Sequence, residues 1–181
     1  MINQLLDVQE KRELVSVYVN LDEQEHFAVG YVMKVLEEQV LLLNVGLHGD
    51  FDGYTAIYIS DIYRIERESQ YLKKIKDLCL FDISDVFKIE DDNTPILSVI
   101  NTSIKKKIVI KLLLLSSNNV IVGYITDIND YSINILQVDD YGYTDGYTVV
   151  KYEDIVQICI GDLDCRDVDI LYHKNKVTED K

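Results

Sequence analysis

Residues 27–65, FAVGYVMKVLEEQVLLLNVGLHGDFDGYTAIYISDIYRI, align without a gap with residues 120–158, VIVGYITDINDYSINILQVDDYGYTDGYTVVKYEDIVQI. Of the 39 aligned positions, 13 are identical, and many others exchange one apolar residue for another. The tetrapeptide Asp52-Gly53-Tyr54-Thr55 recurs as Asp145-Gly146-Tyr147-Thr148. Self-similarity at a fixed spacing is the mark of an internal repeat. The sequence therefore predicts a tandem duplication with a spacing of 93 residues.

Each copy is predicted to form five short β-strands. Apolar and polar residues alternate from Val15 to Leu21, which is the two-residue period of a half-buried strand. Gly30 and Gly123 lie inside the second segment of each copy, where glycine marks a bend that lets a five-stranded sheet curl on itself. The predicted strands span residues 15–21, 26–35, 39–45, 54–59 and 62–67, and then 108–114, 119–128, 132–138, 147–152 and 155–160.

Short helices are predicted only at the edges of the copies. Residues 2–12 and 70–79 place apolar side chains on one helical face, and Thr94-Pro95 opens a third helix, with Thr94 as its N-cap. The charged end of residues 81–93 favours a linker between the copies. We expect a first small barrel over residues 1–80, a linker over 81–93, a second small barrel over 94–172 and a flexible tail over 173–181.

The second copy resembles the first motif of the Sm family. Gly123, Ile125 and Ile128 precede Asp130-Tyr131-Ser132-Ile133-Asn134, which follows the pattern Asp-x-x-apolar-Asn with one extra residue after the glycine. The first copy keeps Gly30, and neither copy has the Arg-Gly of the second Sm motif. The pattern GYI…INILQ…DGYT…EDI is also similar to that of uncharacterised bacterial proteins with tandem barrel repeats. The resemblance implies a mainly β chain of two tandem five-stranded Sm-like or SH3-like small barrels with short flanking helices.

Composition and charge limit the classes of function. The 181 residues include 18 Lys and Arg against 32 Asp and Glu, a formal charge of −14, and 48% are apolar, which is typical of an ordinary globular protein. No apolar run is long enough to span a bilayer, and the N-terminus has no secretory signal pattern. Three scattered cysteines favour a reduced compartment without disulfides. We expect a cytoplasmic protein that does not bind a membrane.

Nucleic-acid binding is the first alternative function. The resemblance to Sm proteins implies that Asn134 would hold an RNA base, but residues 127–169 carry a net charge of −9, which repels a polyanion. The first copy carries the basic residues that RNA binding would need, although the same residues suit a solvated face or pairing with the acidic copy. These basic residues are Arg64, Arg67, Lys73, Lys74 and Lys76. An acidic mimic of nucleic acid is a further, weaker alternative.

The leading hypothesis is a protein-interaction module without catalytic activity. Tyrosine is enriched at protein interfaces, and a tyrosine-rich acidic loop in the second copy suits a basic protein partner. Its residues are Asp139, Asp140, Tyr141, Tyr143, Asp145 and Tyr147. Open strand edges further predict that the copies pack as a pseudo-dimer or that chains join into a homo-oligomer.

No catalytic, cofactor or metal site is expected. The sequence has no paired nucleophile motif, no phosphate-binding glycine loop and no zinc-binding spacing. The loop at 46–53 fails as a calcium site, because His48 and Ile59 would occupy positions that need carboxylates. Tight turns between strands explain the Asp-Gly pairs of this loop and of the loop at 139–146.

Overall fold

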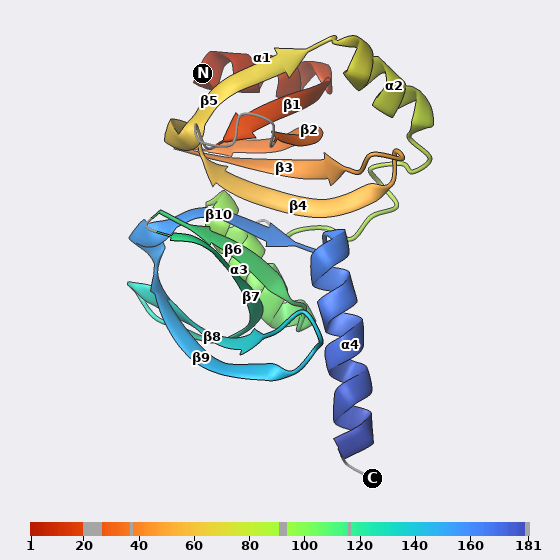
Figure 1. Ribbon diagram of the computed structural model, residues 1–181. Helices are drawn as coiled ribbons and strands as arrows, with labels where there is room; N and C mark the ends of the chain where they lie inside the picture. Colours follow the sequence, from red (N-terminus) through yellow and green to blue (C-terminus); the bar gives the residue numbers. More distant parts are fainter. Residues whose placement is uncertain (20–26, 37, 91–93, 116, 180–181) are drawn as a thin grey trace.

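The chain is mainly β and its strands form one open antiparallel sheet. The computed structural model describes residues 1–19, 27–36, 38–90, 94–115 and 117–179. These residues form ten strands and four α-helices, and the strand order across the sheet is β5-β1-β2-β3-β4-β10-β6-β7-β8-β9 (Figure 1). Strands β1–β5 are called the first sheet half and β6–β10 the second. The halves meet where β4 lies beside β10.

The strands follow the segments predicted from the sequence. The first sheet half contains β1 (Leu14–Val19), β2 (Phe27–Leu36), β3 (Gln39–Val45), β4 (Phe51–Tyr58) and β5 (Ile62–Arg67). The second contains β6 (Ile110–Leu114), β7 (Ser117–Ile128), β8 (Ser132–Val138), β9 (Thr144–Lys151) and β10 (Ile155–Ile160). The predicted mainly β class is therefore confirmed. Residues 20, 21 and 26, which were predicted as strand, lie outside the described residues.

Strand register is the same in the two halves. Leu43 of β3 faces Tyr54 of β4, and 93 residues later Leu136 of β8 faces Tyr147 of β9. The first strand of each half departs from this offset by two residues, because Val15 in β1 and Ile110 in β6 face Gly30 and Gly123. Equal registers place aligned residues on the same face of the sheet, so each pair of aligned residues can be compared directly.

Three of the four helices were predicted. They are α1 (Ile2–Lys11), α2 (Gln70–Leu78) and α3 (Pro95–Lys106), and Thr94 caps α3 by accepting a hydrogen bond from the backbone N–H of Leu97. The fourth, α4 (Leu163–Glu179), was not predicted. It includes residues 173–179, so this part of the segment expected to form a tail is helical. Figure 1 shows α4 leading away from the sheet to the C-terminus.

The largest core joins the two halves. Tyr54 and Ala56 of β4 are buried with Ile158 and Ile160 of β10, and α3 packs against both halves with a buried apolar face. The predicted linker contributes to this core as well, since Phe87 packs its ring 5.3 Å from that of Tyr54. The described part of the linker, residues 81–90, is therefore packed chain rather than a free connection.

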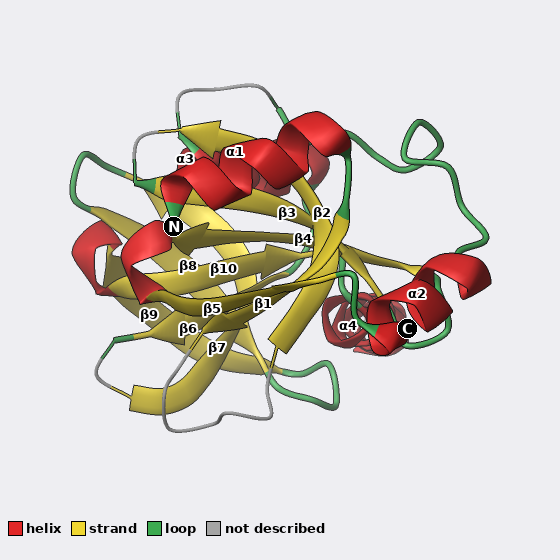
Figure 2. Cartoon of the chain, turned by 90° about the horizontal axis from the view of Figure 1, so that it is seen from above, coloured by secondary structure: helices red, strands yellow, loops and turns green. Residues whose placement is uncertain are grey.

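Each sheet half also has a smaller core of its own. Leu5 and Val8 of α1 are buried against the first sheet half, and Figure 2 shows α1 lying across these strands. In the second half, α4 buries Cys165, Val168 and Tyr172 against the sheet. The helices thus cover parts of each half and leave the outer strand edges, β5 and β9, without a neighbouring strand among the described residues.

Candidate functional site

The tyrosine-rich loop is a tight turn between β8 and β9. The backbone N–H of Asp139 donates to the carbonyl of Tyr143 (2.9 Å), and the N–H of Gly142 donates to the carbonyl of Asp139 (3.0 Å). Asp139 Oδ1 accepts from the backbone N–H groups of Tyr141 (3.0 Å) and Tyr143 (2.8 Å). Asp139 therefore shapes the turn, as short polar side chains often do, and its carboxylate is largely committed there.

Helix α4 holds the loop in place. Asn175 Nδ2 donates to the carbonyl oxygen of Tyr141 at 2.9 Å, which ties the turn to a helix that the sequence did not predict. The side chains of Tyr141 and Tyr143 remain exposed, as do those of Asp140 and Asp145. The structure thus brings Asp139, Asp140, Tyr141 and Tyr143 together in one turn, while Asp145 and Tyr147 follow it in β9.

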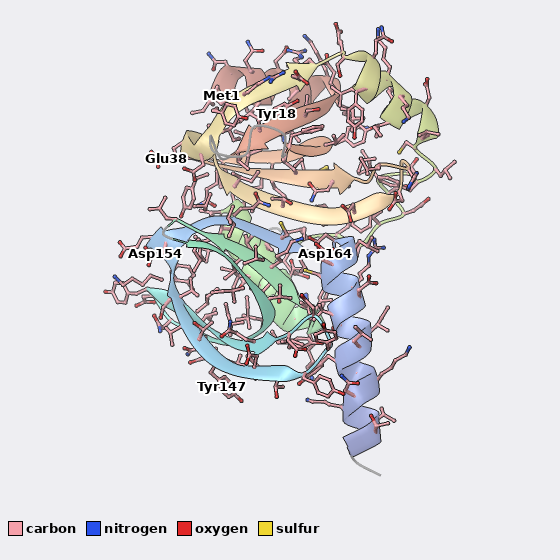
Figure 3. The ribbon with its side chains drawn as sticks, in the orientation of Figure 1. Met1, Tyr18, Glu38, Tyr147, Asp154 and Asp164 are labelled. Carbon is pink, nitrogen blue, oxygen red and sulfur yellow. The ribbon has the colours of Figure 1, made fainter. Side chains whose placement is uncertain are left out.

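Tyr147 belongs to a different feature, the open edge formed by β9. Its side chain is 76% exposed, and that of Val149, two residues along the strand, is 66% exposed. Figure 3 shows Tyr147 projecting from β9 away from the rest of the molecule. Among the described strands, β9 pairs only with β8. Val149 was not among the residues predicted for the site. It aligns with Ala56 and lies two residues after Tyr147, so the strand pattern alone would place it on the same face as Tyr147.

The aligned residues of β4 are buried. Tyr54 is 3% exposed and Ala56 is fully buried, because β10 pairs with β4 and places Ile160 opposite Tyr54 and Ile158 opposite Ala56. The Tyr54 hydroxyl donates to the carbonyl of Phe87 at 2.7 Å, and burial raises the pKa of this phenol to about 12. Two aligned strands that share Asp-Gly-Tyr-Thr are thus a covered interior strand in one half and an open edge in the other.

The glycines of the two tetrapeptides, Gly53 and Gly146, show the same difference in surroundings. Gly53 and Gly146 both have a positive φ, of 76° and 82°, so both sites favour glycine. A Cβ on Gly53 would lie 2.3 Å from the carbonyl oxygen of Ile160 in β10, whereas a Cβ on Gly146 would meet no atom within 4 Å. The Asp-Gly pairs were predicted to lie in tight turns, but Asp52-Gly53 and Asp145-Gly146 lie within β4 and β9, and the turns precede them.

The predicted basic cluster is partly neutralised. Arg67 on β5 pairs with Asp7 (2.8 Å) and Glu13 (2.7 Å), and these carboxylates raise the pKa of its guanidinium. Arg64 pairs with Glu66 and lies 4.4 Å from the centre of the Tyr18 ring. The remaining basic residues, Lys73, Lys74 and Lys76, are exposed on α2. The arginines of β5 therefore stabilise their own sheet edge, which leaves little charge there for a phosphate backbone.

Asn134 lies in a strand and not in a loop. It faces Val149 across the β8–β9 pair, and its Nδ2 is 3.5 Å from the Asp127 carboxylate. A neighbouring carboxylate repels phosphate, so this position is poorly suited to the RNA contact that the Sm resemblance implies.

Labelling of the cysteines tests the packing of the β4–β10 junction directly. Cys159 and Cys165 are 4% and 2% exposed, and burial raises the pKa of both thiols, whereas Cys79 is partly exposed. Because a thiolate is the reactive form, we expect one thiol of the native protein to react quickly with a thiol reagent and two to react only after unfolding. Timed labelling followed by mass mapping should assign the fast site to Cys79. Fast labelling of Cys159 would contradict a closed β4–β10 junction.

The comparisons with known proteins supply no relative from which function could be transferred. No protein-family model matches the chain, and no curated protein matches it. Within the described ranges, His, Cys, Asp and Glu side chains do not gather in any group able to hold a metal ion. None of the helices described is both long enough and apolar enough to cross a membrane.

Proposed function

We propose that the protein is a non-catalytic interaction module that binds a protein partner along the open edge of β9. The observation that carries this proposal is the contrast between two aligned strands. Tyr147 and Val149 lie exposed on β9, while their counterparts Tyr54 and Ala56 are buried on β4, which pairs with β10. An open edge with exposed apolar side chains invites pairing with another chain unless it is protected.

The β4–β10 junction indicates how a partner would bind. There an antiparallel strand supplies Ile158 and Ile160 at alternate positions, which cover the apolar face of β4. A partner strand added to β9 would supply main-chain hydrogen bonds together with apolar side chains over Tyr147 and Val149. The exposed Asp140 and Asp145 nearby favour a partner segment that also carries lysine or arginine.

We further propose that each sheet half is a curled small barrel of the Sm-like type. The same strand order and the same register in both halves support this arrangement. A homo-oligomer would join β9 of one chain to the free β5 edge of the next. Arg64 already pairs with Glu66, and Arg67 pairs with Asp7 of α1 and with Glu13, so these arginines have little charge left to attract the acidic β9 side, which favours a different protein as the occupant of β9.

The test compares two charged variants of the exposed surface. Tyr147→Lys combined with Val149→Lys places two charges on the β9 edge, and edge lysines block strand addition. Tyr131→Lys is the matched control, because Tyr131 is 80% exposed but lies in the turn before β8. We expect proteins captured by the wild type from its host lysate to persist with the control and to be lost with the β9 variant.

Nuclease treatment of the lysate and measurement of the protein's mass in solution distinguish the proposal from RNA binding and from self-association. Partners that survive nuclease and depend on β9 support the proposal. Co-purifying RNA whose removal releases the partners would favour the Sm-like alternative, and self-association lost in the β9 variant would identify a second copy as the occupant. Capture that is unchanged in the β9 variant would overturn the proposal.

A further inference from the structure

Helix α4 has a second apolar face, and this face is exposed. Its first face is buried against the second sheet half. The second face consists of Leu163, Ile170 and Val177, which are 58%, 53% and 59% exposed. We call these three residues the α4 stripe. Figure 1 shows α4 at the margin of the molecule, where its C-terminal half extends past the strands.

The spacing of the α4 stripe is that of a helix that packs along another helix. Its residues are seven positions apart, which is nearly two turns, and apolar residues at this spacing form the seam between paired helices. Each residue turns the helix by about 100°, so Val168 and Tyr172, two positions from Ile170, lie on nearly the opposite side. Because these two residues are buried against the sheet, the stripe points away from it. Two helices can therefore meet through their stripes with each sheet on the outer side of the pair.

The charge of α4 is divided between its two halves. Residues 163–170 contain three aspartates and one arginine, and residues 171–178 contain two lysines and one histidine. Two parallel copies of the helix would place the acidic halves side by side and the basic halves side by side. Two antiparallel copies place the acidic half of each helix along the basic half of the other, and such complementarity fixes the direction and register of an interface.

The α4 stripe is also symmetric about its middle residue. Leu163 and Val177 are each seven residues from Ile170, so antiparallel helices centred on Ile170 bring Leu163 of one chain against Val177 of the other. In the same register Asp167 lies across from Lys174 of the second copy, and the symmetry repeats this pair. Both side chains are exposed. A surface that matches itself in this way is what a two-fold symmetric interface requires.

The opposite flank of the stripe carries Arg166 and His173, which lie near carboxylates of their own chain. Arg166 lies 3.9 Å from Asp52 and donates to the carbonyl oxygen of Phe51 at 3.4 Å. His173 lies 3.7 Å from Asp169. This flank therefore contributes little repulsion between two antiparallel copies of α4.

We propose that a second copy of the chain binds the α4 stripe, as an antiparallel helix pair centred on Ile170. The apolar side chains of the two stripes fill the seam, and Asp167 of each chain pairs with Lys174 of the other. One helix from each chain buries less than the roughly 1,200 Å² at which stable interfaces begin, so we expect a dissociation constant on the order of 100 µM. The stripe is separate from the β9 edge, so this proposal and the proposed function can fail independently.

Sedimentation equilibrium of the full chain tests for this dimer. We expect the average mass of the wild type to rise from that of the monomer toward twice that value between about 10 µM and about 1 mM protein. Ile170→Lys places two like charges at the centre of the seam and should raise the dissociation constant about tenfold or more. Leu115→Lys is the matched control, because Leu115 is 70% exposed and lies just after β6. It should associate like the wild type.

An exchange of charges tests the antiparallel direction. Asp167→Lys alone sets two lysines against each other, and Lys174→Asp alone sets two aspartates against each other, so each should weaken association by about threefold to tenfold. The double variant, Asp167→Lys with Lys174→Asp, restores opposite charges in both pairs. We expect it to recover the affinity of the wild type. Salt screens exposed charges, so the effects of the single variants should shrink at about 1 M sodium chloride.

Each contrary result overturns a stated part of the proposal. A wild type that stays monomeric at the highest concentration excludes the second copy, and a captured protein then lost with Ile170→Lys would identify a different protein as the occupant. Dimers that persist in Ile170→Lys, or that are lost in the β9 variant, exclude the α4 stripe. A double variant that remains as weak as the single variants excludes the antiparallel register. If Ile170→Lys fails to fold, the charge exchange, at exposed positions, still decides the question.

Discussion

Tyr54→Ala is expected to lower the free energy of unfolding by about 3–5 kcal/mol, as truncation of a large buried aromatic side chain does. The Tyr54 ring is 3% exposed and packs against Phe51 and Phe87, with ring centres 5.5 and 5.3 Å away. Its hydroxyl also holds the carbonyl of Phe87, so the variant leaves a cavity and an unpaired carbonyl together. Because these contacts join β4 to residues 81–90, the loss should loosen the connection between the sheet halves.

Tyr147→Ala is the control for the same residue type at the aligned position. Its side chain is 76% exposed, so its removal should change the free energy of unfolding by about 0.5 kcal/mol or less. Urea unfolding of both variants measures the two values on one scale. Equal losses would mean that β9 is covered in solution as β4 is, and a Tyr147→Ala loss that depends on protein concentration would identify a second copy as the cover.

Asp162→Ala is expected to lower the free energy of unfolding by about 2–4 kcal/mol, from the loss of a helix cap and of a partly buried ion pair. Asp162 Oδ1 accepts from the backbone N–H of Cys165 at 2.8 Å in the first turn of α4, and the carboxylate also pairs with Lys111. The Asp162 side chain is 9% exposed and that of Lys111 24%. Removal of the carboxylate therefore leaves a largely buried lysine with only the exposed Asp164.

Two further variants separate the cap from the ion pair. Asp162→Asn keeps a good capping acceptor but removes the charge, so it should retain part of the stability lost in Asp162→Ala. Asp164→Ala removes the other partner of Lys111. Because the Asp164 side chain is 75% exposed, this variant should lower the free energy of unfolding by about 1 kcal/mol or less. Thermal or urea unfolding gives these values. A loss in Asp164→Ala as large as that in Asp162→Ala would show that burial does not govern this ion pair.

Local patterns were sufficient for most secondary structure. Strand periodicity and the Thr94-Pro95 start signal depend on neighbours in sequence, and the corresponding strands and α3 are present. Helix α4 was missed because the apolar residues of its sequence, LDCRDVDILYHKNKVTE, are spread around the helix rather than gathered on one face. Its position depends on Asp162 as a cap and on the contact of Cys165, Val168 and Tyr172 with the second sheet half.

The candidate surface was predicted only in part. Exposure of Tyr141 and Tyr143 agrees with the tyrosine-rich loop expected to face a partner. The role of Asp139 within the turn and the bond from Asn175 depend on how the chain folds back on itself. The contact between Thr55 and Cys159 was not predicted at all, because these residues are far apart in sequence and become neighbours only when β4 pairs with β10.

The sequence by itself determined the alternation of strands and the acidic charge of the second half, because each depends on residue type and spacing. Tertiary structure alone decided which copy of the tetrapeptide is buried. Asp52-Gly53-Tyr54-Thr55 and Asp145-Gly146-Tyr147-Thr148 are identical in sequence, yet only the first lies against β10. The physical reason is that a two-copy sheet has one internal junction and two free edges, so identical segments must end in different surroundings.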